Sequence, residues 1–106
     1  MPKPAQPATT FVGLRIQERR ISLELTQMQL GVRAGVDESS ASGRINQYER
    51  GKHVPDLLTA KRLAEVLEVP LAYLFCDDPE VAEMLRLFHG LSKARRKRLI
   101  DSFIAL

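Results

Sequence analysis

The chain is 106 residues long and carries 16 Lys or Arg against 13 Asp or Glu, a formal net charge of +3 at pH 7. Hydrophobic residues at 44% and charged residues at 27% match folded globular chains, which excludes wholesale disorder, and the length allows one compact domain or a very small domain with an appendage. The single Cys76 excludes a disulfide framework and a Cys-rich zinc site. The polar N-terminus holds no signal-peptide core, and no apolar run approaches the ~18 residues of a membrane span, so we expect a cytoplasmic protein with no membrane partner.

The predicted secondary structure consists of helices alone. Residues 1–10 carry three prolines and little apolar mass, so we expect a flexible N-terminal arm, with Thr10 as the cap of the first helix. The helices are expected, in chain order, over residues 11–23, 27–34, 37–50, 55–67, a short stretch starting near Pro70, residues 80–89 and a last stretch capped by Ser92. No segment alternates apolar and polar residues as a strand does, so the fold class is all-α.

Charge is unevenly distributed along the chain. Residues 10–53 hold seven basic and five acidic side chains, and residues 54–78 hold two basic and five acidic ones. Five of the six residues from Lys93 to Arg98 are basic. Two basic zones separated by an acidic one indicate surfaces with different functions, and a net positive charge is compatible with a polyanion partner.

Two segments carry a recognisable pattern. The stretch LTQMQLGVRAGV (residues 25–36), followed by INQYERGKHVP (residues 45–55), resembles the helix-turn-helix of the phage repressor/Cro-like (XRE) family, whose pattern reads L-T-Q-x-x-L-A-x-x-A-G-V, then I-S-x-x-E-x-G-x-x-x-P. The segment LAEVLEV (residues 63–69) fits the family's following helix, which ends A-x-x-L-x-V. The resemblance implies a five-helix repressor-like helix-turn-helix DNA-binding domain over residues 11–76. A C-terminal helical segment of one or two helices over residues 77–106 would follow it.

The third predicted helix would be the recognition helix, which such a motif lowers into the ~12 Å major groove of DNA. Ile45 and Tyr48 are three residues apart, which puts both on its inner side. The residues left to face outward are the candidate base contacts, namely Ser42, Gly43, Arg44, Asn46 and Gln47. Arg pairs bidentately with guanine, whereas Asn and Gln pair with adenine, so Arg44 is the strongest candidate for a guanine contact. Simple solvation of these side chains is the alternative.

Other polar residues are candidates for contacts to DNA phosphates. Thr26 and Gln27 open the first helix of the motif, where a Gln amide and free backbone N–H groups can bind a phosphate, as the family does at this position. Arg50, Lys52 and His53 follow the recognition helix and would run along the backbone, adding salt-dependent affinity without sequence information. A charged turn beside a helix can equally be solvated only.

For two charged residues the resemblance implies a structural role instead of a DNA contact. The resemblance implies that Arg20 and Glu49 form an ion pair beneath the DNA-binding surface, fixing the first helix against the recognition helix. Gly31 stands where the family favours Ala and would allow close helix approach. Glu24 and Glu68 stand at helix ends where the family often has Gly, so a left-handed backbone there would be strained.

The chain departs from the family between Gly35 and Glu49, where the segment DESSASG contains about four residues more than usual. Four residues are roughly one helical turn. One interpretation is a longer recognition helix, which would push Glu38, Ser39 and Ser40 toward the groove, and the other is a longer loop capped by Ser39 or Ser40. Both serines are therefore further candidate base contacts.

The C-terminal segment has more apolar residues than a small domain needs at its edge. We expect a homodimer interface formed by Met84, Leu85, Phe88, Leu99, Ile100, Phe103 and Ile104. These residues folding back over their own domain is the alternative. The basic run from Lys93 to Arg98 can touch DNA or form a solvated helix face.

Taken together, the sequence predicts a transcriptional regulator, by default a repressor, that binds double-stranded DNA at a palindromic operator. An enzyme is not supported, because the two histidines, His53 and His89, form no metal-binding spacing and no Gly-rich phosphate loop is present. We therefore expect no catalytic residue, metal, cofactor or small-molecule effector. The alternative function is a helix-turn-helix scaffold that binds another protein instead of DNA.

Overall fold

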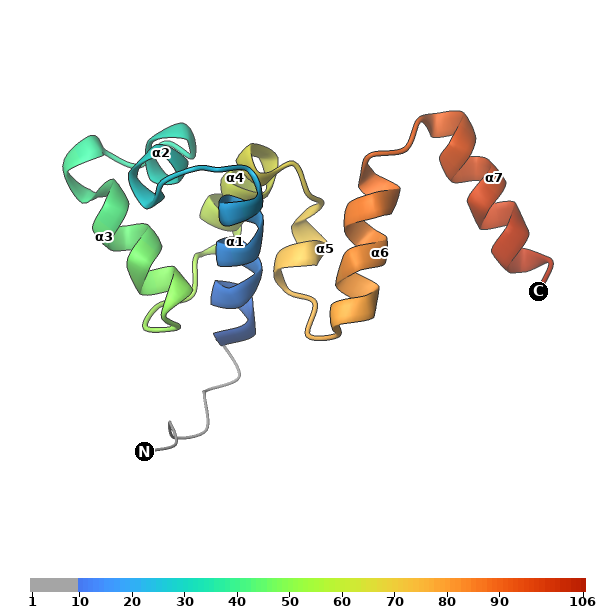
Figure 1. Cartoon of the computed structure of the whole chain (residues 1–106), viewed down its shortest axis with the longest axis horizontal. Coiled ribbons are helices and arrows are strands. Elements are labelled where there is room, and N and C mark those ends of the chain that lie inside the picture. Colours follow the sequence, from blue (N-terminus) through green and yellow to red (C-terminus); the bar gives the residue numbers. More distant parts are fainter. Residues whose placement is uncertain (1–9) are drawn as a thin grey trace.

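The computed structural model describes residues 10–106, so the arm predicted for residues 1–10 lies outside the described residues except at Thr10. Every regular element of these residues is a helix, which confirms the all-α class (Figure 1). The helices are α1 (Thr10–Ser22), α2 (Gln27–Arg33), α3 (Glu38–Glu49), α4 (Leu57–Leu67), α5 (Leu71–Leu74), α6 (Pro79–His89) and α7 (Lys93–Ile104). None of the helices in this part of the chain is long and apolar enough to cross a membrane.

Helix starts follow from local hydrogen bonds. At α2, the Thr26 hydroxyl accepts from the Gln29 backbone N–H while the Gln29 side chain accepts from the Thr26 N–H, a reciprocal capping box. Asp56 caps α4, and the hydrogen bond from Thr59 lowers the pKa of the Asp56 carboxyl, so the cap persists until the pH falls through that lowered pKa. Ser92 caps α7 as predicted, whereas Thr10 is the first residue of α1 instead of its cap.

The first five helices share one apolar core. Each of them contributes at least one fully buried side chain, and these are Ile16, Leu30, Ile45, Leu63, Leu67 and Leu74. Helices α2 and α3 form the most extensive helix pair, and α1 packs against α3. The core therefore holds α3 from two sides and leaves its remaining side to solvent.

Two glycines set the distances at which helices approach α3. A Cβ at Gly31 would lie 2.7 Å from the Cβ of Ala41, so α2 and α3 pack too closely for Ala, the residue that the family favours here. A Cβ at Gly13 would lie 2.6 Å from the carbonyl oxygen of Glu49, at the crossing of α1 with the end of α3. Both glycines are therefore required by close backbone approach.

Two predicted backbone conformations are confirmed. Glu24 and Glu68 have φ values of 57° and 59°, in the left-handed region that costs a residue with a Cβ about 1–2 kcal/mol. Gly35 and Gly51, with φ values of 92° and 72°, end α2 and α3 without that cost.

The core continues beyond residue 76, the expected end of the domain. Ala82 of α6 is buried and Leu85 packs against the core, so α6 belongs to the packed unit. In contrast, no residue of α7 is buried, and Figure 1 shows α7 turning away from α6 at the end of the molecule opposite α3. The segment 77–106 is thus one helix docked on the domain and one helix standing off it.

The Gly31–Ala41 contact generates a stability prediction. We expect Gly31→Ala to destabilise the protein by about 1–3 kcal/mol because the added methyl group overpacks the α2–α3 crossing, despite the better helix propensity of Ala. The matched control is Gly43→Ala in α3, where a Cβ would meet no atom within 4 Å. This control should instead stabilise by about 0.5–1 kcal/mol through helix propensity. Urea unfolding followed by circular dichroism checks both values, and a Gly31→Ala variant as stable as the parent would contradict the packing argument.

Candidate nucleic-acid interface

Helix α3 includes the residues that the sequence has in excess of the family pattern. Helix α3 begins at Glu38, after Asp37, so the additional residues extend the helix and do not form a loop. The Ser39 hydroxyl donates to the Asp37 carboxylate, and Ser40 is exposed. The extra turn therefore brings two acidic side chains and two hydroxyl groups to the start of α3. The buried Ala41, beneath this turn, holds it against Gly31 of α2.

The inner side of α3 is apolar and the outer side is polar, as the spacing predicts. Ile45 is fully buried and Tyr48 is 8% exposed, and burial raises the pKa of the Tyr48 hydroxyl while the Arg44 guanidinium opposes this. Four of the five predicted base contacts, Ser42, Gly43, Arg44 and Gln47, are exposed on the outer side.

The position of Asn46 differs from the expectation that it faces outward. Asn46 is half-buried, and its Oδ1 accepts a hydrogen bond of 3.3 Å from Nε2 of Gln27. The same Gln27 nitrogen donates to Oε1 of Glu49 at 3.2 Å. Both amide hydrogens of Gln27 are therefore used inside the protein, and only the Nδ2 group of Asn46 remains as a donor. This link could not be predicted from the sequence, because the pattern treats Gln27 and Asn46 as separate surface positions.

Beneath α3 lies a bidentate ion pair between Arg20 of α1 and Glu49. The Arg20 Nε lies 2.6 Å from Oε2 of Glu49, and its Nη2 lies 3.0 Å from Oε1. The third nitrogen, Nη1, donates to the Leu25 carbonyl oxygen at 2.9 Å, which links α1 to the residues just before α2. The Glu49 side chain is only 2% exposed. Arg20, Gln27, Asn46 and Glu49 thus form one partly buried network that fixes α1, α2 and α3 relative to one another, and we call it the α3 anchor.

Two further arginines of α1, absent from the sequence-based candidates, attach α1 to the rest of the domain. The buried Arg15 donates from Nε to the Cys76 carbonyl oxygen at 3.1 Å. Arg19 donates twice to the Leu67 carbonyl oxygen, at 3.2 and 3.1 Å, where α4 ends. Basic side chains are well suited to the free carbonyls at helix C-termini, but the distant partner cannot be read from the sequence.

The loop after α3 carries the basic residues predicted to follow the DNA backbone. Arg50, Lys52 and His53 are exposed, and their side chains form no ion pair with any residue in the range 10–106. The backbone N–H groups of Lys52 and His53 both donate to the Gln47 carbonyl oxygen, which holds the loop against the end of α3. Arg44 and Gln47 on α3 and the basic residues of this loop are all exposed, and we call this set of residues the α3 face. The described residues contain no group of three or more His, Cys, Asp or Glu arranged to hold a metal ion.

Helices α2 and α3, joined by a tight turn at Gly35 and packed on a five-helix core, have the geometry of a helix-turn-helix unit. A helix-turn-helix family model matches residues 16–74, which is more than half of the chain. The chain therefore belongs to the helix-turn-helix family of the phage repressor/Cro-like (XRE) type. The family and the fold are those of DNA-binding transcriptional regulators.

The names of individual relatives agree with this family assignment. An uncharacterized HTH-type transcriptional regulator of Sinorhizobium medicae (strain WSM419) is 30% identical over 77 residues, which cover 73% of this chain and 52% of the relative. An uncharacterized transcriptional regulator in the ATPase CF(0) region of Rhodospirillum rubrum is 36% identical over 66 residues, covering 62% and 57% of the two chains. The chain thus spans about half the length of the curated relatives it matches.

A solved structure extends the similarity beyond the motif. The crystal structure of the transcriptional regulator BswR has a TM-score of 0.83 to this chain and is 42% identical to it. The match covers 89% of this chain and 93% of BswR. Residues 79–106 make up more than a quarter of the chain, so a match that covers 89% of it includes part of the C-terminal helices α6 and α7.

The α3 anchor generates a second stability prediction. Glu49→Gln keeps the shape of the side chain but leaves the Arg20 charge without its partner, so we expect a loss of about 3 kcal/mol. The control is Asp101→Asn, which breaks the exposed Lys97–Asp101 pair and should cost less than about 1 kcal/mol. Urea unfolding measures both. Equal effects of the two substitutions would show that the Arg20–Glu49 pair does not anchor α3.

Proposed function

We propose that this protein binds double-stranded DNA sequence-specifically, with α3 in the major groove, and acts as a transcriptional repressor. The observation that carries the proposal is the combination of an exposed polar outer side of α3 with a buried ion pair that fixes its inner side. Such a rigid, exposed helix can present side chains to base edges without first being ordered. The proposed base contacts are Ser42, Gly43, Arg44 and Gln47, with Ser39 and Ser40 on the added turn and Asn46 through its free Nδ2 group.

Contacts to phosphates would position α3 on the duplex. Arg50, Lys52 and His53 form the part of the α3 face that lies beyond the helix, and they make no ion pair within the described residues. The Thr26 hydroxyl accepts a capping hydrogen bond and still has its own proton to donate. Gln27 would contact a phosphate through its backbone N–H, because its side-chain amide is engaged in the α3 anchor.

We further propose that the protein binds a palindromic operator as a homodimer and represses by covering the promoter. A two-fold symmetric dimer places two recognition helices about one helical turn apart on the DNA, which matches an inverted repeat. The apolar side chains proposed for the dimer interface lie in α6 and α7, and these are Met84, Phe88, Leu99, Ile100, Phe103 and Ile104. Leu85 is left out because it packs against the core of its own chain.

Two substitutions separate base reading from phosphate binding. Arg44→Ala should weaken binding to a selected duplex by about 1–3 kcal/mol and relax the preference at one base pair. Lys52→Ala should weaken binding to all duplexes about equally and reduce the slope of log affinity against log salt by about one. Fluorescence anisotropy with selected and scrambled duplexes over a salt series measures both effects.

Two outcomes would overturn the proposal. If Arg44→Ala bound the selected duplex as tightly as the parent, α3 would not read bases through this residue. If no duplex bound in a salt-dependent manner, the protein would instead be a scaffold for protein partners. The acidic Asp37 and Glu38 at the start of α3 are the feature that favours this second function.

A further inference from the structure

Gly43 is a glycine that the packing of the chain does not require. All six glycines of the chain lie within the described residues. Each of the other five has a reason within the chain, which is close packing, a positive φ or a helix end, and these are Gly13, Gly31, Gly35, Gly51 and Gly90. Gly43 lies instead in the middle of α3, where a Cβ would meet nothing within 4 Å beyond its own helix. Because glycine weakens a helix interior relative to alanine, nothing in residues 10–106 explains why a glycine stands here.

Gly43 lies at the centre of the outer side of α3. The buried Ala41 and Ile45 stand two residues before and after it, which is about 200° around the helix and therefore on the opposite side. Its neighbours one turn away on the same side are the exposed Ser39 and Gln47. With α3 in the major groove, Gly43 is therefore the residue whose Cα comes closest to the base edges.

The group that Gly43 presents to DNA is apolar. As in any helix interior, its backbone N–H and C=O are bonded within the helix, so they are not free for a base or a phosphate. What remains is its Cα, beside a space of the size of the methyl group that an alanine would place there. Among the groups that base pairs present in the major groove, the C5-methyl group of thymine is the apolar one.

Gln47 indicates the same kind of base pair. It is exposed one turn further along the same side of α3, and a Gln amide pairs bidentately with N6 and N7 of adenine. Adenine is the partner of thymine in the duplex. Gly43 and Gln47 together therefore match the two bases of A·T pairs, one through a methyl group and the other through a hydrogen-bonding edge.

We infer that Gly43 is a specificity-determining residue, and that the methyl group of a thymine packs against its Cα in the space that a side chain would fill. A Cβ at this position would overlap with that methyl group, so Gly43 selects thymine because it lacks a side chain. The inference rests on the proposed function, sequence-specific DNA binding by α3, and it names the chemical group that the centre of α3 reads.

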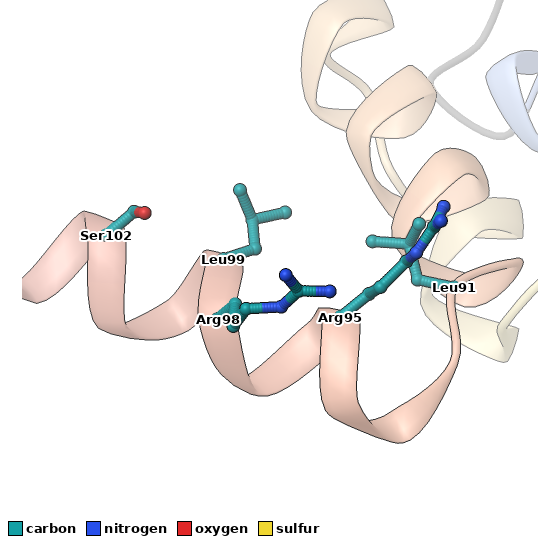
Figure 2. A pocket seen from close by; sticks show the side chains of 5 residues that line it. All are labelled: Leu91, Arg95, Arg98, Leu99 and Ser102. Atoms are coloured by element: carbon teal, nitrogen blue, oxygen red, sulfur yellow. The ribbon is translucent and has the colours of Figure 1, made fainter.

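Basic side chains elsewhere can bind DNA without reading its sequence. Figure 2 shows Arg95 and Arg98 beside Leu99 along α7, and Figure 1 shows α7 at the end of the molecule opposite α3. Affinity from such contacts depends on the salt concentration and not on a single methyl group. Duplexes that differ by one methyl group in each half-site therefore isolate the contribution of Gly43.

Moving a methyl group from the DNA to the protein tests the inference. Gly43→Ala adds the methyl group to the protein, and uracil in place of one thymine in each half-site of a selected duplex removes it from the DNA. The parent should bind the uracil duplex about fourfold more weakly per half-site than the thymine duplex, because it loses one buried methyl contact. Gly43→Ala should show the reverse preference, by about tenfold per half-site, because its own methyl group and that of thymine would occupy one space. Each thymine of the motif is replaced in turn, and fluorescence anisotropy measures the dissociation constants.

Two further variants serve as controls. Gly90→Ala is the matched glycine substitution, at the end of α6, where a Cβ would lie at an ordinary 3.6 Å from the Leu87 carbonyl oxygen. It should bind both duplexes as the parent does. Arg44→Ala should bind both duplexes more weakly but keep the parent's preference for thymine at this position. Urea unfolding should show that Gly43→Ala is at least as stable as the parent.

The inference is overturned if Gly43→Ala binds the thymine duplex as tightly as the parent, or if uracil at no position of the motif reverses its preference. A Gly43→Ala variant that is less stable than the parent also overturns it, because the Cβ would then collide with its own chain. In these cases the parent still binds its selected duplex, so the proposed function stands. If the parent selects no duplex at all, the proposed function fails and the inference fails with it.

Discussion

The structure depends on the buried pair between Arg20 and Glu49. A carboxylate that is 2% exposed is stable only where its charge is matched, and here one guanidinium meets both of its oxygens. The pair lies where α1 crosses the end of α3, and Gly13 permits that crossing because it has no Cβ. Arg20 also donates to the Leu25 carbonyl oxygen, and Glu49 accepts a hydrogen bond from Gln27, so the same pair is bonded to the start of α2. One electrostatic contact thereby sets the orientation of the helix that we propose to read DNA.

The anchor also explains why the exposed side of α3 can be polar and varied. The orientation of α3 is set from its inner side by the ion pair and by the buried Ile45 and Tyr48. The outward residues therefore do not have to pack against the core. Gly43 is the clearest case, since a side chain there would meet nothing within 4 Å. Residues on this surface can therefore change without loss of core packing, and the same holds for α7, none of whose residues is buried.

Much of the fold could be predicted from the sequence because its signals are local. Capping residues, terminal glycines and apolar spacing predict the seven helices of residues 10–106 to within a few residues, and the spacing of Ile45 and Tyr48 predicts the inner side of α3. What escaped prediction depends on distant parts of the chain meeting. The link between Gln27 and Asn46 and the approach of Gly13 to the end of α3 are of this kind, whereas the docking of Leu85 on the core was one of two open alternatives. The extra turn of α3 was one of two open alternatives, and its contact with Gly31 makes the helical one favourable.

Selection of bound duplexes from a pool of random DNA tests whether α3 reads a base sequence. We expect the retained duplexes to share a short motif present as an inverted repeat, with half-site centres about one helical turn apart, as two symmetry-related recognition helices require. Retention should fall steeply as salt rises. A pool that stays random after repeated rounds, while the folded protein is present throughout, would contradict sequence-specific binding by α3.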